Sequence, residues 1–181
     1  MKCKVLCLVG PSGSGKTAIA NGLASRINST RIKTTTTRKP RPDDMPDAYY
    51  FVTKEEFNQL LKEDSLLEHS EYAGEFYGTP KFSVDVVISE KSDSIAVVPI
   101  DINGAKAYKE FYGDKVCVMF VQRNKQSLIE AIIGRDIPVS ERAKRLINLE
   151  KEYENINDCD CCIVNNGDIE TTINNVVKLI S

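Results

Sequence analysis

Residues 10–17 read Gly10-Pro11-Ser12-Gly13-Ser14-Gly15-Lys16-Thr17, and this stretch decides the fold. It follows Lys4–Val9, which has the apolar composition of a buried strand, and it opens the segment Lys16–Ile27. Three apolar side chains recur in that segment at helical spacing: Ile19, Leu23 and Ile27. A strand, a G-x-x-x-x-G-K-[ST] turn and a helix, in this order, are typical of the phosphate-binding loop of nucleoside triphosphate-binding proteins.

The chemistry of this loop points to ATP with Mg²⁺. Its glycines let backbone N–H groups turn inward around a polyphosphate, and the N-terminus of the following helix adds a partial positive charge. We expect Lys16 on the β- and γ-phosphates and Thr17 as a Mg²⁺ ligand. The other expected ATP contacts in the loop are Gly10, Ser12, Gly13, Ser14 and Gly15. A loop that merely joins two elements is the less favoured alternative, and the motif leaves the second substrate open.

Composition bounds the class of protein. The chain has 181 residues, 41% hydrophobic and 28% charged, which fits one soluble domain, residues 1–181. Its net charge of -2 argues against a nucleic-acid partner. No apolar run approaches the roughly 18 residues of a membrane span. The strand begins too early to leave room for a signal peptide, so we expect a cytoplasmic protein. The sequence does not indicate an oligomeric state.

Strand-like and helical segments alternate along most of the chain. Further strands are expected at Ile95–Ile100, Val116–Val121 and Cys162–Val164, and helices at Gly104–Phe111, Gln126–Ile133, Ser140–Ile156 and Ile169–Ile180. This alternation predicts an α/β fold of three layers, in which helices flank a parallel sheet.

The alternation of strands and helices is interrupted between about residues 38 and 92. This stretch holds closely spaced prolines, an aromatic strand Tyr49–Val52, a capping box Thr53-x-x-Glu56 and a strand-like Leu66–Tyr72. We interpret it as an inserted subdomain of mostly antiparallel strands, with the core formed by residues 1–37 and 93–181.

The cysteines allow two interpretations. Cys159, Cys161 and Cys162 could form a metal cluster, but the chain has one His and no second Cys pair at a zinc-like spacing. Reduced thiols in and beside strands are therefore favoured. Cys3, Val5 and Cys7 alternate and are expected on one face of the first strand.

Four elements together resemble the guanylate kinase family: Thr34–Pro42, Asp47–Val52, Glu68 and Phe76–Pro80. Within them, T-T-R-x-P-R and Y-G-T-P are the specific motifs, and the similarity runs in the family's order from Cys7 to the C-terminus. The resemblance implies a fold with an insert that binds a nucleoside monophosphate and a small lid, about residues 134–145. It also implies transfer of a phosphoryl group from ATP to GMP or dGMP.

The resemblance also implies individual roles. The GMP phosphate would be held by Arg38, Arg41, Tyr49 and Tyr77. Glu68 would read the guanine, supported by Thr34, Thr79 and Asp101. The catalytic groups would be Lys16, Arg41, Arg135 and Arg145, the last two from the lid. Asn165 would lie beside the adenine.

Elementary chemistry agrees with this assignment. One carboxylate can accept hydrogen bonds from both N1–H and the 2-amino group of guanine, whereas adenine would leave a buried Glu68 unpaired. Guanidinium groups suit a phosphate dianion. No general base is evident, and none is required when the acceptor is already a phosphate oxygen.

Some residues depart from the family pattern or allow other interpretations. Pro99 stands in the place of a usual acidic residue, Asn103 in that of Gln and Ala131 in that of Arg, and the lid is about one residue short. A catalytically weak or inactive binding module is therefore one alternative, and a P-loop kinase for another small phosphate acceptor is a second. Taken singly, the run Arg31–Arg41 could be a solvated face or an RNA patch, and Glu68 could form an ordinary surface pair with His69. Tyr49 and Tyr77 could be core aromatics, and Arg135 a helix C-cap partner.

Overall fold

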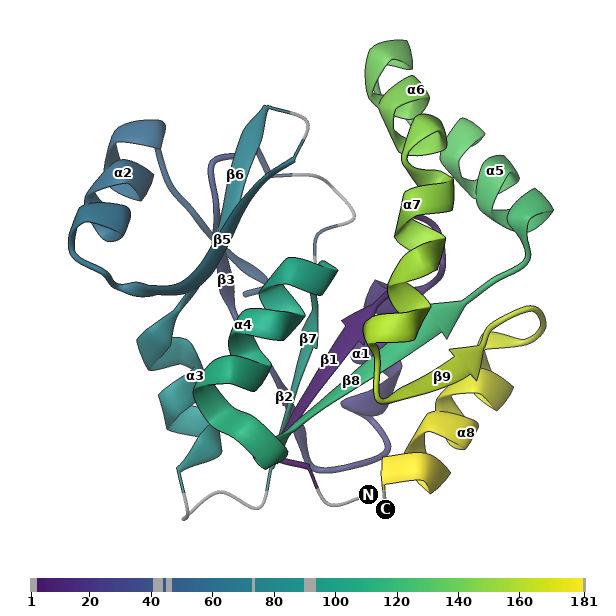
Figure 1. The fold of residues 1–181 in the computed structure, drawn as a ribbon, viewed down its shortest axis with the longest axis horizontal. Coiled ribbons are helices and arrows are strands. Elements are labelled where there is room, and N and C mark those ends of the chain that lie inside the picture. The colour runs from purple at the N-terminus through teal and green to yellow at the C-terminus, as the bar shows by residue number, and fades with distance from the viewer. Residues whose placement is uncertain (1–2, 41–43, 45–46, 73, 90–93, 181) are drawn as a thin grey trace.

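A computed structural model describes residues 3–40, 44, 47–72, 74–89 and 94–180 of the chain (Figure 1). Its larger sheet has five strands in the order β2-β7-β1-β8-β9. Their bounds are Ser29–Arg31 for β2, Ile95–Pro99 for β7, Val5–Val9 for β1, Val116–Gln122 for β8 and Cys161–Val164 for β9. All neighbouring pairs run parallel, which confirms the expected α/β architecture.

The central strand β1 has all its residues buried, and their alternation divides the core in two. Leu6 and Leu8 face a cluster with α1 (Lys16–Leu23) and α8 (Ile169–Ile180). Val5, Cys7 and Val9 face a second cluster with α3 (Lys81–Ile88) and α4 (Ile102–Tyr112). The sheet is thus the middle of three layers, and its carboxyl edge is left for the loops.

Further helices follow β8. They are α5 (Lys125–Ile133), α6 (Val139–Ile147) and α7 (Leu149–Glu154), and short 3-10 turns occupy Gly113–Lys115 and Asn155–Asp158. In Figure 1, α5 and α6 rise beyond the carboxyl edge of the larger sheet. Within the described residues, no helix is both long and apolar enough to cross a membrane.

A second, smaller sheet carries the acceptor-side residues. Its order is β4-β3-β6-β5, formed by Tyr49–Phe51, Thr34–Thr36, Glu75–Pro80 and Leu66–Tyr72. β3 pairs with β4 in parallel, and the other two pairings are antiparallel, so the mostly antiparallel character is confirmed. The capping box is confirmed at the start of α2 (Lys54–Lys62). Thr34–Thr36 joins this sheet although it precedes residue 38, and the division into core, insert and lid stays a prediction.

Several local expectations need correction. The first helix ends at Leu23 and not at Ile27, and the long helix expected over Ser140–Ile156 is divided at Asn148. Cys3 packs in the cluster opposite to that of Val5 and Cys7, because it precedes β1 and does not share its alternation. Helix α3 was not anticipated, although Val84, Val87 and Ile88 have helical spacing.

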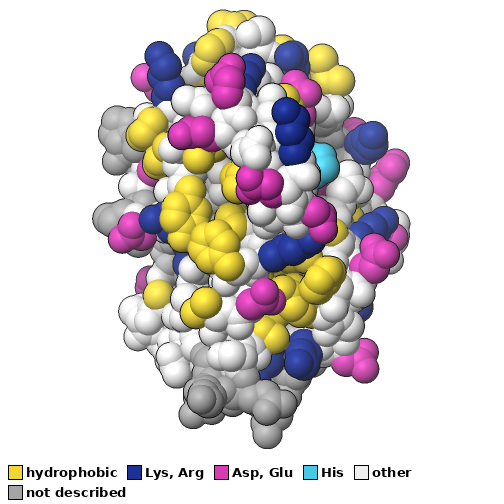
Figure 2. Space-filling view, turned by 90° about the vertical axis from the view of Figure 1, so that its left-hand side faces the viewer, with side chains coloured by type: hydrophobic (Ala, Val, Ile, Leu, Met, Phe, Trp, Pro, Cys, Tyr) yellow, Lys and Arg dark blue, Asp and Glu magenta, His cyan; other side chains and the backbone are white. Residues whose placement is uncertain are grey.

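The surface turned toward the viewer in Figure 2 mixes acidic and basic side chains around apolar groups. The exposed large apolar side chains of the described chain include Phe82, Val86 and Phe111. Charges of both signs lie near one another on this face, without a continuous basic field. Such a mixture is ordinary for a protein surface.

The contact between α1 and α8 gives a test of the core. Ile173 is 2% exposed, and its Cδ1 lies 2.2 Å from where a Cβ on Gly22 would be. Ile173→Ala should lower the free energy of unfolding by about 3 kcal/mol, because it opens a cavity between these helices. Leu179→Ala, on the same helix but 40% exposed, should cost less than about 1 kcal/mol. Urea unfolding of both variants measures the difference, and equal losses would contradict the packing described.

Candidate active site

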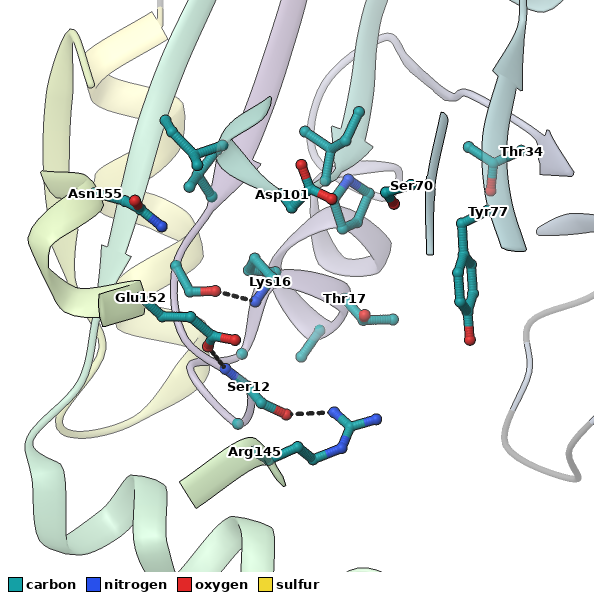
Figure 3. Close-up of a pocket in the computed structure, with 18 of the residues that line it drawn as sticks. Ser12, Lys16, Thr17, Thr34, Ser70, Tyr77, Asp101, Arg145, Glu152 and Asn155 are labelled. Atoms are coloured by element: carbon teal, nitrogen blue, oxygen red, sulfur yellow. Dashed lines mark hydrogen bonds between the residues drawn. The ribbon is translucent and has the colours of Figure 1, made fainter. Parts of the chain in front are cut away.

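A cavity of about 600 Å³ opens where the loop after β1 faces the smaller sheet (Figure 3). Most of the candidate residues line it: Gly10, Ser12, Gly13, Gly15, Lys16, Thr17, Thr34, Tyr49, Glu68, Tyr77, Asp101, Arg135 and Arg145. The structure therefore brings together residues from both sheets and from the segment after α5.

The remaining candidates lie elsewhere. Ser14, Arg38, Thr79 and Asn165 are buried and do not line the cavity. Arg41 lies outside the described residues. The cavity also takes in residues that sequence reasoning did not propose for the site, among them Ser70, Glu152 and Asn155.

The phosphate loop depends on the backbone of Gly15. Its φ is 100°, in the left-handed region, and it is the residue that precedes the first turn of α1. A Cβ there would lie 2.4 Å from Asn165 Nδ2, closer than atoms can approach. The helix consequently begins with its free N–H groups next to the cavity, as anion binding requires.

Asn165 supports this loop from behind. Its Nδ2 donates a 2.8 Å hydrogen bond to Ser14 O, and its Oδ1 accepts one of 3.0 Å from Thr172 Oγ1. Asn165 and Thr172 are both buried. The end of β9 and the first turn of α8 therefore fix the position of the loop backbone.

Lys16 extends over the loop that precedes it. Its Nζ donates to Gly10 O at 2.5 Å and to Pro11 O at 3.0 Å. Burial lowers the pKa of Lys16 to about 8, while the carboxylate of Glu152 favours the charged form. The ammonium group is thus positioned at the mouth of the loop.

Ser12 connects the loop to the helices that follow α5. Its backbone N donates to Glu152 Oε2 at 3.0 Å, and its Oγ accepts from Arg145 Nη1 at 2.6 Å. Arg145 also donates to Glu141 Oε1 at 2.6 Å and is 8% exposed. Because the contact with Glu152 spans 140 residues, no local sequence pattern could have revealed it.

On the opposite side of the cavity, Glu68 is held by its neighbour on β6. Thr79 Oγ1 donates to Glu68 Oε1 at 2.6 Å. Asp101 lies nearby and caps α4, its Oδ1 accepting from Gly104 N at 2.9 Å. Burial raises the pKa of Glu68 to about 7, and the charge of Asp101 adds to this shift.

Arg38 follows β3 of the smaller sheet and lies next to the ring of Tyr49. It donates to both carboxylate oxygens of Asp44, at 2.7 and 3.0 Å, and its guanidinium carbon is 5.1 Å from the Tyr49 ring centroid. Although burial opposes the charged form, hydrogen bonding to Asp44 and its charge raise the pKa of Arg38. The guanidinium is thus charged and fixed next to Tyr49.

A family model described as guanylate kinase matches residues 2–181. The chain belongs to the guanylate kinase family. It is 33% identical to a guanylate kinase of Desulfitobacterium hafniense over 89% of this chain and 81% of that protein. It is 32% identical to a guanylate kinase of Clostridium perfringens, over 97% of this chain and 82% of that protein. The crystal structure of guanylate kinase from Anaplasma phagocytophilum matches this fold with a TM-score of 0.71 at 25% sequence identity. The match covers 99% of this chain and 84% of that one.

Two departures from the guanylate kinase pattern lie at the cavity. Pro99, the last residue of β7, and Ala131, on α5, both line it. The methyl group of Ala131 would lie 3.1 Å from a Cβ on Gly13. A small side chain at this position therefore packs closely over the phosphate loop and contributes no positive charge.

The close approach of Gly15 and Asn165 can be tested directly. Gly15→Ala should weaken binding of a Mg²⁺-nucleoside triphosphate by about tenfold to a hundredfold, which is about 1.4–2.8 kcal/mol, because the loop backbone must shift. Gly167→Ala is the matched control, since a Cβ there meets nothing within 4 Å. Titration calorimetry measures both affinities after circular dichroism has verified folding. Unchanged affinity in Gly15→Ala would contradict the role given to this residue.

Proposed function

We propose that this chain transfers the γ-phosphate of ATP to GMP, giving ADP and GDP. The observation that carries the proposal is the cavity lined by both the phosphate loop and Glu68. The loop suits a triphosphate donor, and a carboxylate in a half-buried position suits a base that offers two adjacent donors. Membership of the guanylate kinase family supports the same reaction.

On the donor side, the backbone N–H groups of the loop and Lys16 Nζ would hold the ATP phosphates. The Thr17 hydroxyl is exposed at the cavity and would hold Mg²⁺ together with phosphate oxygens, which fits the preference of this ion for oxygen ligands. When bound, Mg²⁺ neutralises charge on the transferring phosphate. Asn165 would act as a support for the loop, through its bond to Ser14 O.

On the acceptor side, Glu68 would accept hydrogen bonds from N1–H and the 2-amino group of guanine. Thr79 orients that carboxylate, and Thr34 and Asp101 line the cavity around it. The phosphate of GMP would lie toward Tyr77 and Tyr49, with Arg38 beside Tyr49 as a fixed positive charge. We propose that Arg41 also holds the GMP phosphate.

Transfer would then rest on position and charge. Lys16, Arg135 and Arg145 line one cavity, so their charges can surround a phosphoryl group that passes between the two nucleotides. To contact it, Arg145 must move from Ser12 Oγ and Glu141, and this links the lid to donor binding. The acceptor phosphate oxygen is the nucleophile, so no side chain has to remove a proton. We also propose a cytoplasmic location, where both nucleotides occur.

A panel of acceptors tests the reaction. With Mg²⁺-ATP in excess, ADP release should be fastest with GMP and slower by at least a hundredfold with AMP, CMP and UMP, because only guanine pairs both donors with Glu68. A coupled assay measures each rate. Turnover of AMP or CMP without turnover of GMP would refute the proposal, and a sugar phosphate as the best acceptor would favour a different kinase.

Glu68→Gln should lower kcat/KM for GMP by about tenfold to a hundredfold, because an amide cannot accept from both guanine donors. Affinity for Mg²⁺-ATP should stay within about twofold of the unmodified protein. Glu71→Gln, an exposed change of the same kind on β5, is the control and should alter neither. A GMP kcat/KM that survives the change at Glu68 would remove this residue from the base site.

The raised pKa of Glu68 predicts a pH dependence. Guanine requires the carboxylate, which is mostly protonated below its pKa of about 7 and ionised above it. Between pH 8 and pH 6, kcat/KM for GMP should therefore fall about tenfold. Steady-state rates across this range measure the change. The Glu68→Gln variant should lack the step near pH 7, and an identical step in that variant would assign it to another group.

A further inference from the structure

Ser70 lines the cavity without a role in the reaction proposed above. It lies on β5 two residues after Glu68, and side chains two residues apart along a strand share a face. Figure 3 shows Ser70 across the cavity from the phosphate loop, on the side of Thr34 and Tyr77. Ser70 is therefore part of the surface on which the acceptor would lie.

The register of β5 and β6 places Ser70 directly opposite Tyr77 and two residues along β5 from Glu68. Glu68 pairs with Thr79, and Ser70 pairs with Tyr77. The hydrogen bond from Thr79 Oγ1 to Glu68 Oε1 shows that the side chains of the first pair meet. Along the strand, Ser70 is about 7 Å from the base end at Glu68, at about 3.4 Å per residue.

The sugar of a nucleoside monophosphate joins the base to the phosphate. The Tyr77 ring extends away from Ser70 (Figure 3). A base at Glu68 and a phosphate near the Tyr77 hydroxyl would therefore leave the sugar near Ser70. A serine hydroxyl can both donate and accept a hydrogen bond, which suits a ribose hydroxyl. No hydrogen bond joins the Ser70 hydroxyl to another side chain within the described parts of the chain, so it is available to a ligand.

Asp101 is another polar group at the cavity that could contact the sugar. Its Oδ1 is engaged as the cap of α4, and its charge acts on Glu68, which places it at the base end. Ser70 lies on the smaller sheet, between Glu68 and the hydroxyl end of Tyr77, where the sugar would be.

We propose that Ser70 binds the ribose 2′-hydroxyl of the acceptor and thereby sets a preference for GMP over 2′-deoxy-GMP. This inference rests on the proposed function and adds the sugar to the groups that the site reads. Ser70 acts here as a specificity-determining residue, because it contacts a part of the acceptor remote from the transferred phosphoryl group.

The test compares kcat/KM for GMP and 2′-deoxy-GMP in the unmodified protein and in Ser70→Ala. The unmodified protein should favour GMP by about fivefold, the effect of one hydrogen bond between neutral groups. In Ser70→Ala, kcat/KM should fall about fivefold with GMP and change little with 2′-deoxy-GMP. Removing the Ser70 hydroxyl and removing the 2′-hydroxyl abolish the same hydrogen bond, so the two losses should not add. Ser89→Ala removes an exposed hydroxyl at the end of α3 and should leave the ratio unchanged.

Two outcomes would overturn the inference. An equal loss with both acceptors would show that Ser70 supports the strand and not the sugar. Unchanged rates with both would show that its hydroxyl contacts neither. Either result would leave GMP phosphorylation intact as the proposed function. Failure of the unmodified protein to phosphorylate GMP would instead refute that function and this inference with it.

Discussion

The left-handed backbone at Gly15 is the constraint on which the rest of the site depends. It turns the end of the loop that follows β1 into α1, so the loop and the first helical turn present their N–H groups to the same space. Asn165 leaves no room for a side chain at this point. The parallel order of the larger sheet then brings the carboxyl ends of β7 and β8 to the same edge, where the cavity opens.

Around this loop the protein must hold cations close together before any phosphate arrives. Lys16, Arg135 and Arg145 line a single cavity, and like charges in such proximity repel one another. Glu141 and Glu152 provide the compensating charge, the first through Arg145 and the second through the loop backbone at Ser12. In the structure described, these internal carboxylates therefore neutralise the positive charge that substrate phosphates would neutralise when bound.

Features encoded by neighbouring residues could be predicted from the sequence. The phosphate loop at residues 10–17 and the capping box at Thr53 are each patterns of a few consecutive residues. The structure contains both a strand–loop–helix unit and that cap. The strand order and the contacts of Ser12 could not be predicted, because they join residues far apart in sequence. Ser70 was missed although its spacing of two residues from Glu68, in the expected strand Leu66–Tyr72, already places both side chains on one face.

The bond between Asn165 and Ser14 has a consequence for synthesis of the chain. It joins positions 151 residues apart, and Asn165 is in turn held by Thr172 on α8. A ribosome therefore makes the glycine-rich motif long before it makes the side chain that supports it. Until β9 and α8 have emerged and docked, the nascent chain carries a motif without its finished geometry. The chain can therefore hold a nucleotide only late in its synthesis, after α8 has positioned Asn165 against the loop.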